Sequence, residues 1–245
     1  MSTQILTDNF SQPLNGVTAA KVDIHAGDGN LTIDRLSNGE QVLASGTLQY
    51  LESQGSPGWA LDSNNGQTTL TLMGSASRRP RFRFPWAACN GATEWQIYLN
   101  PTVLCDITAQ SNGGNVSLNL AGMAVTRLSA DTGGGNVVVV LPEDAADLSV
   151  TARSGGGNVT VEIGTGTMGS NNVNASSGAG NVIVRVPSGL AARIHATTGL
   201  GKTIMDPQFS GIGKHTYQSP DFDSAANKVE ITVNSGAGNV SVNTR

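Results

Sequence analysis

Aromatic side chains make up only 4% of this 245-residue sequence, and charged side chains only 13%. A globular core usually takes much of its volume from Phe, Tyr and Trp, so a core here must be filled by Val, Leu, Ile and Ala. Charged residues normally form about a quarter of a chain, so the polar surface must consist mainly of Ser, Thr, Asn and Gln. The formal net charge of −4 gives no reason to expect nucleic acid as a partner.

Long apolar segments are also absent. No run of about 18 apolar residues occurs, so the sequence predicts no membrane span. Residues 1–10 lack the basic start and apolar stretch of a signal peptide. We therefore expect a truncated or mature chain of the cell envelope, outside the cytoplasm, with a cytoplasmic protein as the alternative.

Few residues are available for metal or redox chemistry. The only two cysteines, Cys89 and Cys105, could form a disulfide or remain two independent buried thiols, and two cysteines do not identify a compartment. The histidines His25, His195 and His215 are too scattered to form a metal site. We therefore predict neither a metal nor a cofactor.

One Gly-rich motif recurs along the chain and dominates its organisation. It reads Ser/Thr-Gly-x-Gly-Asn-Val-x-Val, with variations. Its Asn position falls at Asn30, Asn115, Asn136, Asn158, Asn181, Lys202 and Asn239. From Asn115 to Lys202 the steps are 21, 22, 23 and 21 residues. Apolar and polar residues alternate on both sides of each motif, and a period of two indicates a strand with one buried face.

Each repeat therefore predicts a strand, a Gly-rich corner and a second strand. Such a unit cannot bury its apolar face alone, so we expect units stacked every 21–23 residues with like strands paired. The predicted fold is a single all-β domain over residues 1–245, a single-stranded β-solenoid. Glycine is expected because the corner must turn with positive φ. The stacked corner asparagines are expected to form an amide ladder, so we interpret them as structural.

Two segments interrupt the repeat. The first is a basic and aromatic insert near residues 78–90. Its candidate contact residues are Arg78, Arg79, Arg81, Phe82, Arg83, Phe84 and Trp86. Arginine and aromatic side chains together can bind anionic glycans, lipid head groups or a partner protein. Alternatively, the insert is a cap over an exposed end of the core. The second segment, residues 206–226, is expected to be a flap loop.

Three sequence patterns that resemble chemical sites do not fit their motifs. Residues 198–203 end like a phosphate-binding loop, but Ala196 stands where the first Gly is required. Calcium-binding nonapeptide repeats need an Asp shortly after the glycines, and Val116 and its equivalents occupy that place. A Gly-x-Ser-x-Gly nucleophile motif is absent from the sequence.

A carbohydrate-active β-helix enzyme has to be weighed as well. Such an enzyme needs carboxylates or basic residues clustered on one outer face. The outward positions offer Arg127, Arg153 and Arg193, which could stack as an anion site without paired acids, although a solvated face is the preferred interpretation. We therefore predict no catalytic residues and a protein that is not an enzyme.

The order and spacing of the motifs resemble the bacterial toast-rack and adhesin-like β-solenoid families. The resemblance rests on the opening segment Ala20–Ile33, on the recurring corners and on the closing segment Tyr217–Val233. It covers nearly the whole chain apart from the insert. It implies a module of envelope-stress or cell-surface proteins and no catalytic residues. Members usually follow membrane helices or a signal sequence, and neither is recognised here.

These observations lead to one preferred function and two alternatives. We expect a non-enzymatic interaction module of the cell envelope or surface that binds a protein partner, an envelope glycan or a lipid head group. A β-helix carbohydrate-active enzyme is the first alternative. The second is a structural solenoid that forms homo-oligomers through its ends or edges, where unpaired strands readily join other chains.

Overall fold

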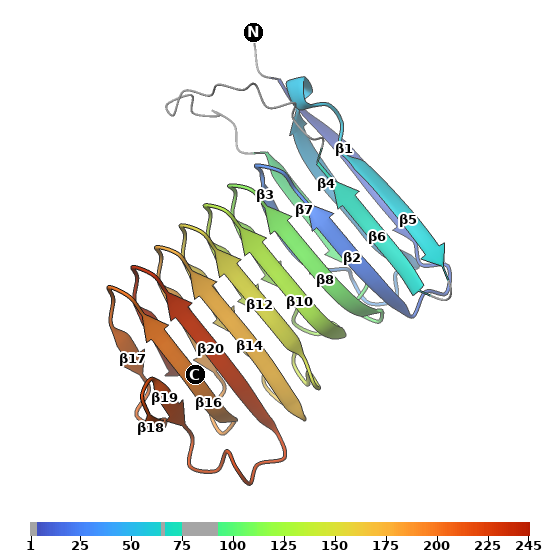
Figure 1. Ribbon diagram of the computed structural model, residues 1–245. Helices are drawn as coiled ribbons and strands as arrows, with labels where there is room; N and C mark the ends of the chain where they lie inside the picture. Colours follow the sequence, from blue (N-terminus) through green and yellow to red (C-terminus); the bar gives the residue numbers. More distant parts are fainter. Residues whose placement is uncertain (1–3, 65–66, 75–92) are drawn as a thin grey trace.

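The computed structural model describes residues 4–64, 67–74 and 93–245 as two long β-sheets that enclose a core (Figure 1). Sheet A has ten strands in the spatial order β1 (Ile5–Pro13), β4 (Val42–Leu51), β7 (Glu94–Leu99), β3 (Asn30–Arg35), β9 (Val116–Asn119), β11 (Val137–Val140), β13 (Val159–Glu162), β15 (Val182–Val186), β21 (Val240–Thr244) and β17 (Thr203–Met205). The predicted all-β class is therefore confirmed.

Sheet B has eleven strands and faces the viewer in Figure 1. Its spatial order is β18 (Ser210–Gly213), β19 (Thr216–Gln218), β16 (Ala191–Thr198), β20 (Lys228–Ser235), β14 (Ser170–Ser177), β12 (Ser149–Ser154), β10 (Val125–Thr132), β8 (Leu104–Ser111), β2 (Ala19–His25), β6 (Gln67–Met73) and β5 (Gly58–Asn64). One short 3-10 turn, Glu52–Gln54, follows β4.

The middle of the molecule is a stack of coils, each made of a sheet B strand, a Gly-rich corner and a sheet A strand. Strands β8, β10, β12 and β14 pair in parallel, as do β9, β11, β13 and β15. Residues at the same position of the repeat lie opposite each other, so that Val137 stands between Val116 and Val159. The repeat length of the sequence therefore corresponds to one turn of chain around the core.

Both ends of the stack depart from the repeat. At the N-terminal end, β1 pairs antiparallel with β4, β4 with β7, and β5 with β6. At the other end, the β18–β19 hairpin pairs antiparallel with β16. The two sheets are therefore mixed, and the structure does not confirm one single-stranded solenoid over residues 1–245.

The order of coils in space also differs from their order in the sequence. Strand β3 lies directly beside β9, although Leu31 and its partner Val116 are far apart in the chain. The C-terminal strands β20 and β21 lie between β14 and β16 and between β15 and β17. The prediction that the corners of Asn181 and Lys202 are neighbours is therefore wrong, because the coil of Asn239 separates them.

Residues 206–226 extend and close one end of the stack. Strands β18 and β19 lie in this segment and continue sheet B beyond β16. Phe209 and Phe222 are buried, and the Arg193 guanidinium lies 4.2 Å from the centre of the Phe222 ring. The segment expected to be a flap thus contributes two strands and two buried aromatic side chains.

Aliphatic side chains, with Cys105 and Met123, fill the middle of the core. Residues 100–208 contain no Phe, Tyr or Trp, and the inward-facing Val, Leu, Ile and Ala side chains of these coils are buried. Aromatic residues pack at the two ends instead: Phe209 and Phe222 are buried at one end, and at the N-terminal end the ring centres of Phe10 and Trp59 lie 5.8 Å apart and Trp95 is buried. This distribution follows from the thin cross-section of the regular coils.

Close backbone contact, and not positive φ, accounts for the last glycine of each corner motif. A Cβ added to Gly157 would lie far inside the contact distance of the Gly135 carbonyl oxygen in the preceding coil. Added Cβ atoms would clash in the same way at Gly29, Gly114, Gly135, Gly180, Gly201 and Gly238. Among the corner glycines only Gly27 has a positive φ, +67°. The predicted conformational reason for these glycines was therefore wrong.

The middle position of the motif is open, which explains its variety. A Cβ on Gly156 would come no nearer than 3.7 Å to the neighbouring coil, an ordinary van der Waals distance. Other coils carry larger residues at this place, namely Asp28, Ala179, Leu200 and Ala237. Coil stacking therefore restricts the motif at specific positions and leaves one position free.

Replacing Gly157 with Ala is expected to destabilise the protein by about 1–3 kcal/mol, because the new methyl group must push two coils apart. Gly156→Ala is the matched control and is expected to change the free energy of unfolding by less than about 0.5 kcal/mol. Urea unfolding followed by far-UV circular dichroism measures both. Equal effects of the two substitutions would contradict the proposed role of the close contact.

Candidate interaction surface

The corner asparagines form a continuous hydrogen-bond ladder along one edge of the molecule. The side-chain oxygen of each Asn accepts the backbone N–H of the corresponding residue in the next coil, at 2.8–2.9 Å. The series runs through Asn30, Asn115, Asn136, Asn158, Asn181, Asn239 and Lys202. The bond that continues through every coil thus runs from a backbone N–H to an amide oxygen. The amide-to-amide bond expected from the sequence is present at the first two steps, from Asn115 to Asn30 at 3.3 Å and from Asn136 to Asn115 at 3.2 Å. Lys202 carries no acceptor and stands in the last coil, where the ladder ends.

A second ladder of hydroxyl groups runs beside the first, and the sequence reasoning missed it. Ser154 Oγ donates to the Gly135 carbonyl at 2.7 Å and accepts the Gly157 N–H at 2.8 Å. The same two bonds recur at Ser111, Thr132, Ser177, Thr198 and Ser235. The sequence signal for this hydroxyl ladder is the Ser or Thr that opens each motif. Both ladders use corner groups to hold coils together, which supports the structural interpretation of the asparagines.

The outer face of sheet B presents short polar side chains in straight rows. Because the strands pair in register, corresponding residues of successive strands lie side by side. The central row consists of Asp23, Thr108, Ser129, Thr151, Asn174, Thr232 and His195. With a strand spacing of about 4.8 Å, this row is roughly 30 Å long. Figure 1 shows these strands side by side along one face of the molecule.

Ion pairs on this face lie near its two ends and also between β10 and β8, where Arg127 is 3.8 Å from a carboxylate oxygen of Asp106. Lys21 Nζ lies 2.8 Å from a carboxylate oxygen of Asp23, and this contact raises the pKa of Lys21. At the other end, the Arg193 guanidinium lies 2.7 Å from Asp223 and 3.9 Å from Glu230. Strand β14 in the middle carries only Ser, Asn, Val and Ala. The central row of the face therefore presents mainly hydroxyl and amide groups, and the charged residues Arg127, Asp131 and Arg153 lie in the rows beside it.

The three arginines considered as an anion site do not stack. Arg127 lies opposite Ser149 of β12, so Arg153 is displaced along its strand and lies opposite Asp131. Strands β14 and β20 separate β16, which carries Arg193, from β12. Arg127 also lies 3.8 Å from a carboxylate oxygen of Asp106. The prediction of an arginine stack is therefore wrong, because the register places these side chains apart.

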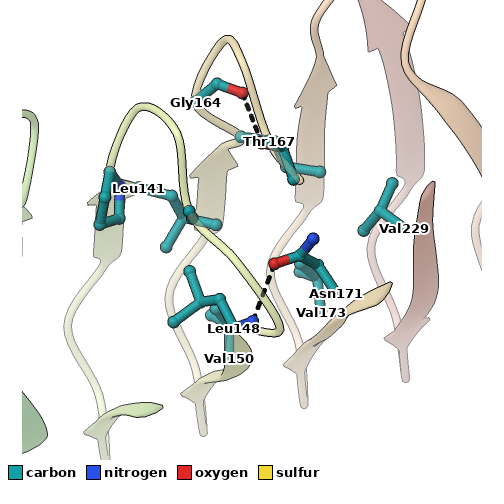
Figure 2. Close-up of a pocket in the computed structure, with 11 residues that line it drawn as sticks. Leu141, Leu148, Val150, Gly164, Thr167, Asn171, Val173 and Val229 are labelled. Carbon is teal, nitrogen blue, oxygen red and sulfur yellow. Dashed lines mark hydrogen bonds between the residues drawn. The ribbon is translucent and has the colours of Figure 1, made fainter. Parts of the chain in front are cut away.

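A small apolar cavity lies between coils near the corner opposite the asparagine ladder (Figure 2). The polar side chains that line it already form hydrogen bonds with backbone groups. The side-chain oxygen of Asn171 accepts the Leu148 N–H at 2.8 Å, and its amide nitrogen donates to the Met168 carbonyl at 2.7 Å. Thr167 donates to the Gly164 carbonyl at 2.8 Å. The space admits about one water molecule. Its size and apolar lining make it a packing defect and not a ligand site.

Cys105 is a free, buried thiol among the described residues. Its Sγ donates to the Val103 carbonyl at 3.3 Å, and burial raises the pKa of the thiol to about 12. The reactive form of cysteine is the thiolate, so Cys105 is unsuited to act as a nucleophile at neutral pH. Cys89 lies outside the described residues.

Three further points of the sequence analysis concern the basic and aromatic group, metal binding and membrane spans. The whole basic and aromatic group, Arg78 to Trp86, falls outside it, so its role as interaction site or cap stays a prediction. Within residues 4–64, 67–74 and 93–245, no group of three or more His, Cys, Asp and Glu residues could hold a metal ion. None of the described segments is a helix with the length and apolarity to cross a membrane.

A family model for the N-terminal domain of toast_rack (DUF2154) matches residues 2–162, more than half of the chain. The chain belongs to the toast-rack family. No curated protein sequence matches it. The solved structure of a proposed cell adhesion protein from Clostridium sporogenes has a TM-score of 0.70 and 18% identity, over 99% of this chain and 100% of that one. This likeness shows a shared fold.

A second solved structure, a proposed adhesin from Bacteroides fragilis, has a TM-score of 0.41 and 14% identity over 98% of both chains. The toast-rack match and the Clostridium structure thus agree with the family resemblance that the ordered motifs carry in the sequence. Neither comparison assigns a ligand to the polar face of sheet B.

Replacing Asn158 with Ala removes one acceptor from the middle of the ladder and leaves the Asn181 N–H without its side-chain partner. We expect a loss of about 1 kcal/mol in the free energy of unfolding. Asn172→Ala is the control, because this exposed Asn lies on β14 outside the ladder. Thermal and urea unfolding measure the difference between the variants. A control that is equally destabilised would show that the ladder bond is not the cause.

Proposed function

We propose that this toast-rack protein is a non-enzymatic interaction module of the cell envelope or cell surface, and that the outer face of sheet B is its binding surface. The in-register rows of hydroxyl and amide groups on this face carry the proposal. Family membership supports it, since the resemblance implies envelope and surface proteins. The name of the Clostridium sporogenes protein, a proposed cell adhesion protein, points in the same direction.

The chemistry of the face suits an extended polar polymer. Hydroxyl groups such as those of Thr151 and Thr232 both donate and accept hydrogen bonds, and amides such as that of Asn174 do so through separate atoms. Short side chains lose less conformational entropy on binding than Lys or Arg. The rows repeat at the strand spacing, so a polymer with its own repeating hydroxyl and amide groups can make many weak contacts. An envelope glycan with N-acetyl groups has this chemistry.

The experiment is co-sedimentation of the purified full chain with peptidoglycan and, separately, with anionic lipid vesicles, at low and moderate salt. Thr151→Arg places a long charged side chain in the central row, and we expect it to lower retention on peptidoglycan at least tenfold. Thr160→Arg is the matched control, because Thr160 lies on the outer face of sheet A, on the strand after the same corner.

Each outcome has a definite meaning. Retention on peptidoglycan that Thr151→Arg abolishes and Thr160→Arg leaves intact supports the proposed surface. An equal loss in both variants contradicts it, as does the absence of retention. Selective retention on anionic vesicles, weakened by salt, would replace the glycan with lipid head groups as the ligand.

The basic segment predicted from the sequence offers a second site, tested by replacing Arg81 and Arg83 with Ala. If the segment binds the envelope, the double variant loses retention and keeps its melting temperature. If the segment is a cap, the melting temperature or the solubility falls instead. This comparison separates the two roles that the sequence leaves open.

The absence of enzymatic activity is part of the proposal and is tested separately. A carbohydrate-active enzyme of the usual kind needs two carboxyl groups about 5–10 Å apart around its substrate. We expect no soluble fragments when the chain is incubated with peptidoglycan, as measured by release of reducing sugar. Release that depends on an acidic residue of the outer faces would favour the enzyme alternative.

A further inference from the structure

The edge of sheet A at β17 is unpaired, whereas sheet B is continued past the last coil. In the described part of the chain, β17 pairs with β21 on one side and with no strand on the other. The Lys202 carbonyl accepts the Val240 N–H, and the Asp206 N–H donates to the Val242 carbonyl, both at 2.9 Å. Because backbone groups of a strand alternate in direction, those of Thr203 and Met205 point outward from this edge.

Two exposed apolar side chains lie at this edge of sheet A, and a third lies on the edge strand of sheet B at the same end of the stack. Leu200 is 86% exposed at the last corner, Ile204 is 50% exposed on β17, and Ile212 is 57% exposed on β18. Most large apolar residues of the described chain are buried in the core. Leu200 and Ile204 therefore present apolar surface at this edge that another molecule can cover.

The charges beside Ile204 have opposite signs and lie symmetrically about it. Lys202, Ile204 and Asp206 are alternate residues and therefore point to the same face of the sheet. Lys202 is exposed, and its side chain takes no part in the ladder that its backbone N–H completes. The N–H groups of Gln208 and Thr244 donate to the Asp206 carboxylate, and these bonds lower the pKa of Asp206. Asp206 is therefore negatively charged at neutral pH.

We propose that β17 pairs antiparallel with β17 of a second copy of this chain, around a two-fold axis at Ile204. Centred there, Thr203 of each copy lies opposite Met205 of the other, so the outward backbone groups of both residues form hydrogen bonds. Lys202 of each copy lies opposite Asp206 of the other. The two Ile204 side chains meet at the axis, where non-hydrogen-bonded residues approach to a Cα separation of about 4.5 Å.

Charge complementarity selects this arrangement and this occupant. A parallel pairing of two β17 strands in the same register would place Lys202 opposite Lys202, which is unfavourable. The antiparallel arrangement pairs opposite charges twice and buries exposed apolar surface. It is also closed, because each copy uses its only β17 edge, so a two-fold dimer forms and not a fibre. This interface lies at the end of the stack and is independent of the face proposed to bind the envelope.

The first test compares the self-association of the full chain and of two charge variants by sedimentation velocity over a range of concentrations. We expect the unchanged chain to show a monomer–dimer equilibrium. Lys202→Glu places like charges opposite each other on both sides of the axis and should raise the dimer dissociation constant at least tenfold. Lys214→Glu is the control, because this exposed lysine lies between β18 and β19 and makes the same change in net charge.

The second test uses a disulfide across the proposed axis. In a Cys89→Ser background, Ile204→Cys is expected to form a covalent dimer under mild oxidation, because the two Cα atoms are close enough to be bridged. Ser241→Cys is the control. Ser241 lies opposite Ile204 on β21, one strand farther from the axis, and is expected not to cross-link.

A chain that stays monomeric at all concentrations, and whose Ile204→Cys variant forms no cross-link, would overturn the proposal. Lys202 would then act as a charged residue that keeps an open edge from pairing, and Lys202→Glu would change nothing. Equal effects of Lys202→Glu and Lys214→Glu would also overturn it, since they would reflect net charge alone. Retention on peptidoglycan should be the same for the Lys202 variant and the unchanged chain in either case.

Discussion

The stacking of one coil directly on the next, at the distance of hydrogen-bonded strands, is the constraint on which the rest of the structure depends. At the corners this distance brings backbone against backbone, so Gly157 must lack a side chain where it meets the Gly135 carbonyl. The same contact allows Ser154 and Asn158 to reach groups of the preceding and following coils. The motif Ser/Thr-Gly-x-Gly-Asn is thus the set of residues that permits and then fastens this contact.

The stacking also determines where the surface chemistry lies. Residues that face outward on sheet B are held in straight rows, because a shift of one residue in register would turn the buried valines outward. Thr108, Ser129 and Thr151 therefore stand at a regular spacing that the strand pairing sets. A binding surface of this kind depends on the backbone of the whole stack. Single side chains on it can vary while its flatness and spacing are kept.

The sequence predicted the repeating part of the fold because its information is local and periodic. Alternating residues such as Val159 and Val161 identify the buried face of a strand, and the even spacing of the asparagines gives the length of a coil. The all-β class and the parallel stacking followed from these signals, and the order of the motifs carried the resemblance to the toast-rack family. The hydroxyl ladder was also readable, but Ser and Thr are common in turns, and their recurrence was not interpreted.

The features that the sequence did not predict depend on long-range pairing. No periodic signal indicates that β1 and β4 pair antiparallel, or that the coil of Asn239 separates those of Asn181 and Lys202. The arginine stack failed for a related reason, since outward direction alone does not give the register between Arg127 and Arg153. The polar face was noted only as a general property, because its rows exist only once the strands are aligned.

The insertion of β20 and β21 between earlier strands determines the order in which the layers can fold during synthesis. During synthesis, the strands up to β15 emerge in the order in which they stack, apart from the N-terminal pairings. Strands β16 and β17 then emerge before the layer on which they rest. That layer comes later in the sequence, so the last two layers assemble only after residues 228–244 have been synthesised. A nascent chain stopped before residue 228 therefore exposes two unpaired sheet edges, which marks it as incomplete to any factor that binds open strands.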